Sequence, residues 1–168
     1  MVTVSEAATP TQLDAVRALI RAFIAWHRER HTQDLHLIDA YFDASAFEDE
    51  LATLPGVYAP PSGGLLLATQ DEEPAGCVAL RGIDPDYCEM KRMFVYPKFH
   101  GQGVGLALGR GVIDLARNRG YKAMRLDTSI RQAEAKALYA GLGFRMIPPY
   151  YELPSDMRDW LVFMELAL

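Results

Sequence analysis

The sequence predicts an α/β fold in which one domain, residues 1–168, forms a central mixed sheet of six or seven strands with helices on both faces. Short apolar runs bounded by turn residues alternate with longer segments whose apolar residues recur every three or four positions, as in strands and helices. The order strand–helix–strand over residues 87–128 predicts two parallel strands, because such a crossover joins parallel neighbours. A chain of 168 residues, 50% of them hydrophobic, is long enough for a substantial core.

The first half of the chain is expected to form a short strand, two helices and a three-stranded meander. Thr9 is a suitable N-cap and Pro10 fits the first helical position, so together they mark the start of the first helix. The second helix should end at Pro55 and Gly56. The expected elements are the strand 2–7, the helices 10–30 and 44–54, and the strands 65–69, 76–81 and 87–95.

The second half alternates between helices and strands. Val104, Leu108 and Val112 lie on one face of a predicted helix, and Gly120 is its expected stop. The proline-rich aromatic segment 148–154 is expected to be a loop. The expected elements are the helices 104–118 and 133–142 and the strands 122–128, 144–147 and 160–166.

Composition narrows the function classes. A formal net charge of -5 argues against non-specific nucleic-acid binding, which depends on a basic surface. No apolar run approaches the roughly 18 residues that span a bilayer, and no targeting segment is evident, so we expect no membrane contact and a cytoplasmic protein. Cys77 and Cys88 lie in apolar runs and should be reduced core thiols. His27, His31 and His36 show no metal-binding spacing and are expected at the surface, so no metal is predicted.

The most informative segment runs from His100 to Ala107, between a predicted strand and a predicted helix. Its glycines allow close backbone approach, and the first amides of the helix carry partial positive charge, so the segment suits a bound phosphate. The dinucleotide pattern G-x-G-x-x-G fails because Leu106 and Leu108 stand at the possible third-glycine positions, and the Gly-Lys of the Walker pattern is absent. The alternative is a tight strand-to-helix turn that binds nothing.

This segment resembles the cofactor motif of the GCN5-related N-acetyltransferase (GNAT) family, Arg/Gln-x-x-Gly-x-Gly/Ala. Gly103 and Gly105 match the motif, and His100 stands at the Arg/Gln position. Residues 89–95 are similar to the strand that precedes the motif in this family.

A second signature of the family is similar to residues 135–144, which end in Leu-Tyr-x-x-x-Gly-Phe, with Gln132 where the family usually has Asn. The resemblance covers residues 60–147 well and the first 55 residues by the order of elements alone.

The resemblance implies that acetyl-CoA is the cosubstrate and that its pantetheine arm lies between the strands 87–95 and 122–128. Strict alternation leaves neither face of the first of these strands apolar, so we expect a bulge near Arg92 or Met93. A regular strand carrying two solvated basic residues is the alternative. The residues implied in cofactor binding are Met93, Phe94, Val95, His100, Gly101, Gln102, Gly103, Val104, Gly105, Leu106, Ala107, Gln132 and Lys136.

The resemblance also implies two catalytic residues. A protonated amine must lose a proton before it attacks a thioester, and Glu89 stands where the family often places the base. Tyr139 matches a tyrosine near the cofactor sulfur, where a phenol can protonate the departing thiolate. The alternatives are an ion pair between Glu89 and Lys91, and a core tyrosine with its hydroxyl at the rim.

The implied function is direct transfer of an acetyl group to a primary amine of a small molecule or peptide. The first two helices and the loop 148–154 are expected to contact this acceptor. A non-catalytic acyl-CoA-binding sensor and a nucleotide-binding domain are the competing interpretations, and a homodimer is the default oligomer.

Overall fold

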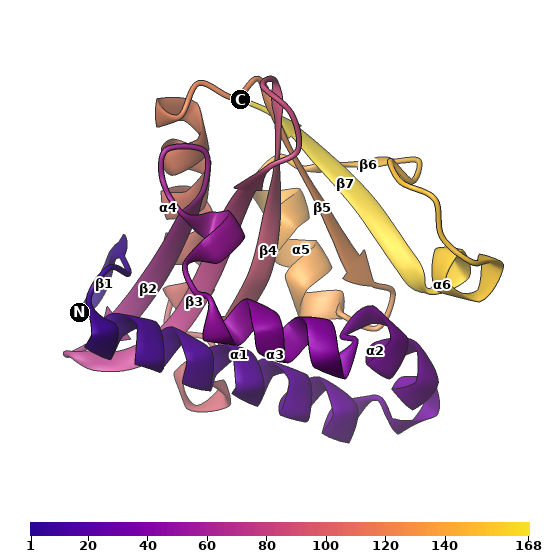
Figure 1. Cartoon of the computed structure of the whole chain (residues 1–168), viewed down its shortest axis with the longest axis horizontal. Helices are drawn as coiled ribbons and strands as arrows, with labels where there is room; N and C mark the ends of the chain where they lie inside the picture. Colours follow the sequence, from indigo (N-terminus) through magenta and orange to yellow (C-terminus); the bar gives the residue numbers. More distant parts are fainter.

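The computed structural model describes residues 1–168 and contains a seven-stranded mixed sheet with helices on both faces, which confirms the predicted fold class (Figure 1). The strand order is β1-β2-β3-β4-β5-β7-β6, and only β4 and β5 are parallel neighbours. The strands are β1 (Val2–Glu6), β2 (Gly64–Gln70), β3 (Glu73–Gly82), β4 (Tyr87–Val95), β5 (Ala123–Ser129), β6 (Arg145–Ile147) and β7 (Leu161–Ala167).

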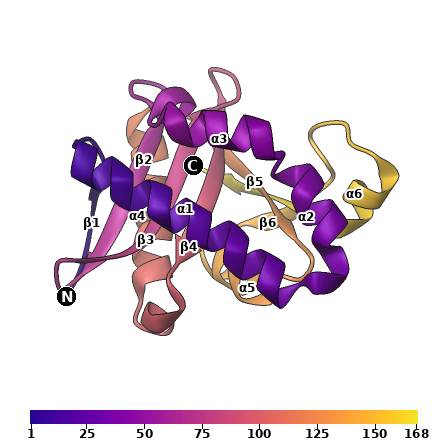
Figure 2. The ribbon, with the colours of Figure 1, turned by 60° about the horizontal axis from the view of Figure 1, so that its bottom comes forward.

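Helices α1 and α3 cover one face of the sheet, and α4 and α5 cover the other (Figure 2). No helix is both long enough and apolar enough to cross a bilayer. The helices are α1 (Pro10–Arg30), α2 (Leu35–Tyr41), α3 (Ala44–Ala52), α4 (Val104–Asn118), α5 (Ala133–Gly141) and α6 (Ser155–Trp160), and the 3-10 turns are η1 (Thr32–Asp34), η2 (Gly56–Tyr58) and η3 (Pro97–Phe99).

Helix α1 begins where the sequence predicts, because its first turn is capped locally. The Gln12 amide donates to Thr9 Oγ1 at 3.2 Å, and the Thr9 amide donates to Gln12 Oε1 at 3.1 Å. These reciprocal hydrogen bonds satisfy amides that a helix start leaves free. The face that carries Val16, Leu19 and Ile20 is buried against the sheet, so α1 is fixed across it.

The sequence did not predict α2 and α6, which span seven and six residues and have no side-chain cap. Helices this short are stabilised mainly by tertiary packing, which local sequence does not reveal. Leu37 and Ile38 of α2 pack with Trp160 at the end of α6 and with β7, in a small separate core. The two helices therefore enclose the end of the sheet beside the loop that follows β6.

Strands β4 and β5 pair over three residues and then part. Tyr87–Glu89 of β4 faces 123–125 of β5, whereas β7 pairs with β5 along its whole length. Figure 1 shows the two strands diverging towards α1. This divergence opens the sheet between its two middle strands.

The predicted bulge in β4 is present and lies on the open side. Cys77 of β3 faces Phe94 while Ala79 faces Lys91, so β4 has one extra residue over this stretch. Arg92 has φ 58°, in the left-handed region. Cys77 itself is buried and reduced, as the sequence predicts.

Candidate active site

A groove of about 330 Å³ runs along the open side of β4. The second half of β4, the glycine segment, the start of α4 and one face of α5 form its walls, and Phe23 and Trp26 of α1 cover it. Ten of the residues predicted to bind cofactor line this groove: Met93, Phe94, Val95, His100, Gly101, Gly103, Val104, Gly105, Leu106 and Gln132.

Two glycines in the segment are required by the backbone. Gly101 and Gly103 have φ of 76° and 84°, and a Cβ at either position would meet no atom within 4 Å. The left-handed backbone conformation, and not lack of space, therefore favours glycine there. Gly103 is the N-cap of α4, whose first amides have no carbonyl within the helix to bind. This helix start suits an anion.

Gly105 differs from the other two glycines because its φ is not positive. A Cβ there would lie 3.4 Å from Leu138 Cδ2 of α5, in ordinary contact across the groove. A long side chain at this position would therefore fill the space between α4 and α5.

Three predicted cofactor residues do not line the groove. The Gln102 side chain donates to Lys98 O at 3.0 Å, and the Ala107 amide donates to Gly103 O at 3.0 Å within α4. Lys136 lies on α5 outside the groove lining. His100 lines the groove, but its ring Nε2 lies 3.0 Å from the carbonyl oxygen of Val95.

A smaller chamber of about 70 Å³ lies between the diverging strands and adjoins the groove. Phe23, Met93, Gln132 and Ala135 line both spaces. The rest of the lining includes the aromatic and polar side chains of His27, Tyr41, Lys91, Arg92, Asp127, Tyr139 and Trp160.

Tyr139 lies in the chamber wall with 6% of its surface exposed. Its ring packs against Phe144 at a centroid distance of 5.9 Å, and its hydroxyl has no hydrogen-bond partner in the protein. Burial, and secondarily the charge of Asp127, raises the pKa of the Tyr139 hydroxyl. The hydroxyl is therefore protonated at neutral pH and free to donate.

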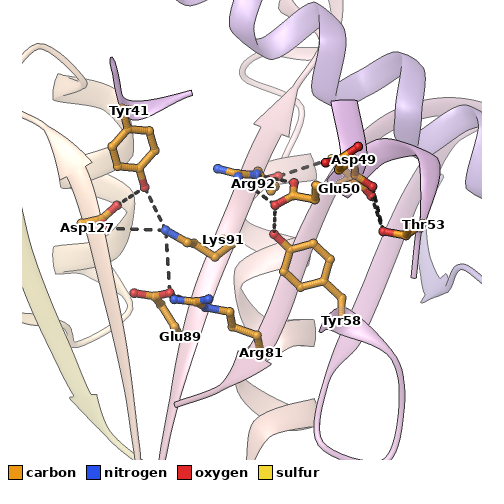
Figure 3. A network of polar contacts seen from close by, with 11 residues as sticks. Tyr41, Asp49, Glu50, Thr53, Tyr58, Arg81, Glu89, Lys91, Arg92 and Asp127 are labelled. Carbon is orange, nitrogen blue, oxygen red and sulfur yellow. Dashed lines mark hydrogen bonds and ion pairs between the residues drawn. The ribbon is translucent and has the colours of Figure 1, made fainter. Parts of the chain in front are cut away.

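Glu89 does not line the chamber, and its side chain is 1% exposed. Arg81 Nε donates to Oε1 at 2.8 Å, and the Tyr150 hydroxyl donates to Oε2. Lys91 Nζ is 3.7 Å from Oε1, so the ion pair weighed as the alternative is present (Figure 3). Glu89 faces an outer hollow of about 380 Å³ on the far side of Lys91.

Asp127 of β5 is the carboxylate that lines the chamber, and the sequence motifs did not predict it. Its side chain is 2% exposed, accepts hydrogen bonds from the hydroxyls of Tyr41 and Tyr151, and lies 3.8 Å from Lys91 Nζ. Lys91 Nζ also donates to the Tyr41 hydroxyl at 2.9 Å. A carboxylate that follows the apolar Leu126 within a central strand was the available signal.

Residues 16–144 of the chain match the acetyltransferase (GNAT) family. The chain belongs to this family. It is 32% identical over 169 residues to an uncharacterised N-acetyltransferase of Schizosaccharomyces pombe, a match that covers 99% of this chain and 95% of that protein. Human N-acetylaspartate synthetase is 33% identical over 130 residues, which cover 75% of this chain and 43% of that protein.

The fold likeness extends to a solved structure, the PaiA N-acetyltransferase of Thermoplasma acidophilum in complex with coenzyme A. The TM-score is 0.73 at 14% identity, over 100% of this chain and 99% of that chain. The family and the enzyme class predicted from the motifs are confirmed, and the protein is a GNAT acetyltransferase.

The histidines of this acetyltransferase correct the expectation that all of them lie at the surface. His27 and His31 are 2% and 8% exposed, and their ring centroids are 4.9 Å apart. His27 lines the chamber, and its Nδ1 has no hydrogen-bond partner. The signal was its position four residues after Phe23, on the buried side of α1. His36 is exposed, as expected.

Burial, together with the charge of His31, lowers the pKa of His27 from 6.5 to about 4. In the unfolded chain His27 therefore binds a proton below about pH 6.5, whereas in the folded chain it binds this proton only below about pH 4. The free energy of unfolding should therefore decrease as the pH is lowered through this window, by at most about 1.4 kcal/mol per pH unit for this group. Urea unfolding of the parent and of His27→Gln from about pH 7 to about pH 4 measures the difference.

His27→Gln should flatten the pH dependence, whereas the control His36→Gln changes an exposed ring and should leave it unaltered. A slope that is the same in the parent and in His27→Gln would contradict the assignment of this proton to His27.

Proposed function

We propose that this GNAT enzyme transfers the acetyl group of acetyl-CoA directly to a primary amine. The observation that carries the proposal is the continuity of two spaces: a groove that begins at an anion-binding helix start, and a chamber with an unpartnered tyrosine hydroxyl and a buried carboxylate. The pyrophosphate would lie at the start of α4 and the thioester where the groove meets the chamber. The whole chain, residues 1–168, would act as one cytoplasmic catalytic domain.

Transfer requires a group that protonates the departing thiolate. Tyr139 suits this role because it lines the chamber and its hydroxyl has no hydrogen-bond partner in the protein and holds its proton at neutral pH. The amine attacks the thioester carbon, the tetrahedral intermediate collapses, and the sulfur leaves as a thiol after it takes the Tyr139 proton.

Transfer also requires a group that accepts the proton of the amine. The family resemblance points to Glu89, whereas the geometry favours Asp127, which lines the chamber while Glu89 lies behind Lys91. We propose that Asp127 receives the proton, directly or through water, and that Glu89 keeps Lys91 in place beside it. The two carboxylates lie 3.8 Å and 3.7 Å from Lys91 Nζ, respectively.

The acceptor would enter through the outer hollow, which shares Tyr41, Lys91 and Arg92 with the chamber. The chamber is small, so it would admit only the reacting amine while the rest of the molecule stays in the hollow. N-acetylaspartate synthetase makes an acetylated amino acid by its name, so carboxylate-bearing amines belong in the first screen. Release of free CoA thiol with amino acids, polyamines, aminoglycosides or peptides tests the proposal and excludes a non-catalytic sensor.

Acetyl-CoA should stabilise the fold, by about 2.7 kcal/mol at 100 times its dissociation constant. Gly105→Glu should abolish this shift, because the new side chain fills the groove near Leu138 and sets a carboxylate against phosphate. Thermal unfolding with and without acetyl-CoA measures the stabilisation of the parent protein and its loss in Gly105→Glu. Gly141→Ala is the control, since a Cβ at Gly141 meets nothing within 4 Å and lies outside the groove. A parent protein that saturating acetyl-CoA does not stabilise would refute the cofactor assignment.

Asp127→Asn should lower the turnover number by roughly 10²–10⁴, with the defect shrinking at high pH, where the amine loses its proton unaided. Glu89→Gln should lower the turnover number by a smaller factor if Glu89 only holds Lys91 in place. Both rates are measured by CoA release with a common acceptor as a function of pH. The reverse order of the two defects would move the base to Glu89.

Tyr139→Phe keeps the ring in its packing and removes only the hydroxyl. Turnover should fall by about 10²-fold, the low end for acid–base groups, because a thiolate leaves partly unaided. The affinity for acetyl-CoA and the melting temperature should change little, since the hydroxyl has no protein partner to lose. Single-turnover measurements isolate the chemical step, and an unchanged rate there would remove Tyr139 from the mechanism.

A further inference from the structure

The bulge in β4 is tied to α3 by a buried ion pair. Arg92 Nε and a terminal nitrogen of its guanidinium each lie 2.9 Å from a different carboxylate oxygen of Glu50. Tyr58 of η2 donates its hydroxyl to the same carboxylate at 2.9 Å (Figure 3). The side chains of Arg92 and Glu50 are 12% and 19% exposed, and Tyr58 is 1% exposed. A two-point contact of this kind fixes orientation as well as distance.

Arg92 is also the residue with the least ordinary backbone in the sheet. Its φ of 58° lies in the left-handed region, which costs a residue with a Cβ about 1–2 kcal/mol. The other non-glycine residues with positive φ, Asp71 and Glu72, lie in an exposed turn. A conformation of this kind inside a sheet persists only where the surrounding contacts enforce it.

The extra residue in β4 changes the side of the sheet towards which the side chain after Arg92 points. Met93 follows Arg92 and lines both the groove and the chamber, at the point where the two spaces meet. A β4 without the extra residue would shift the alternation of side chains by one position from there to the end of the strand. The shape of the groove therefore depends on the backbone at position 92.

We infer that Glu50 and Tyr58 are positioning residues that, through Arg92, hold the β4 bulge in the shape that acetyl-CoA binding requires. The inference rests on the proposed use of the groove by acetyl-CoA. Glu50 and Tyr58 line neither the groove nor the chamber, so they act only through Arg92.

Two variants at position 92 separate the backbone effect from the loss of the side chain. Arg92→Ala and Arg92→Gly both remove the guanidinium, but only alanine resists positive φ. Acetyl-CoA should bind roughly 5- to 30-fold more weakly to Arg92→Ala than to Arg92→Gly, the factor that corresponds to the left-handed penalty, because the two variants lose the same side-chain contacts. Calorimetric titration with acetyl-CoA alone is the measurement, because it involves no acceptor.

The ion pair between Glu50 and Arg92 is tested by substitution of Glu50. Glu50→Gln should weaken binding because Arg92 loses its charged partner, and Arg92→Gly in that background should restore it. Glu165→Gln is the matched control: Glu165 is 16% exposed and forms a 2.9 Å ion pair with Arg125, away from the bulge. It should leave acetyl-CoA binding unchanged. If Glu50→Gln does not fold, Tyr58→Phe tests the same contact by removing one hydroxyl, and should weaken binding by a smaller factor.

Equal dissociation constants for Arg92→Ala and Arg92→Gly would overturn the inference, as would failure of Arg92→Gly to rescue Glu50→Gln. Failure of the parent protein to bind acetyl-CoA would instead overturn the proposed function, so the two results are distinct.

Discussion

The parting of β4 and β5 is the constraint on which the rest of the structure depends. The pairing between these two neighbouring strands ends at Glu89 and Arg125. Backbone groups beyond this point that would have paired across the gap need other partners or solvent. The bulge, the groove and the chamber all lie on the open side of this point. An extended ligand with amide groups is suited to such a gap, because it can pair with strand backbone as an added strand does.

Charge balance makes the gap tolerable in a folded protein. Burying an ion is costly unless an opposite charge and hydrogen bonds accompany it. Three cations and three carboxylates meet around the open strands, so the cluster has no net charge: Arg81, Lys91, Arg92, Glu50, Glu89 and Asp127. Tyrosine hydroxyls from three separate segments complete the hydrogen bonds of the carboxylates. Groups held in this way need little rearrangement when charge develops during a reaction.

What the sequence predicted well is what local chemistry determines. The capped start of α1, the bounds of α4 and the glycine segment depend on neighbours within a few residues, and each was found in place. Features that depend on distant partners were missed or misjudged. Helices α2 and α6 form because they pack on each other, and His27 is buried because α1 lies across the sheet. Trp26 covers the groove for the same reason, and no motif in its own segment indicates this.

The two buried carboxylates differ in their position relative to the point where β4 and β5 part, and residue type alone does not reveal this difference. Glu89 belongs to the last pair of the parallel ladder, opposite Arg125, so its backbone is fixed at the vertex of the opening and its oxygens are held by Arg81 and Tyr150. Asp127 lies two residues beyond the vertex, where β5 has no partner on the side of β4. Asp127, inside the opening, lines the chamber, whereas Glu89, at the vertex, lines the outer hollow. The family resemblance locates the strand, and the end of the ladder determines which carboxylate lines the chamber.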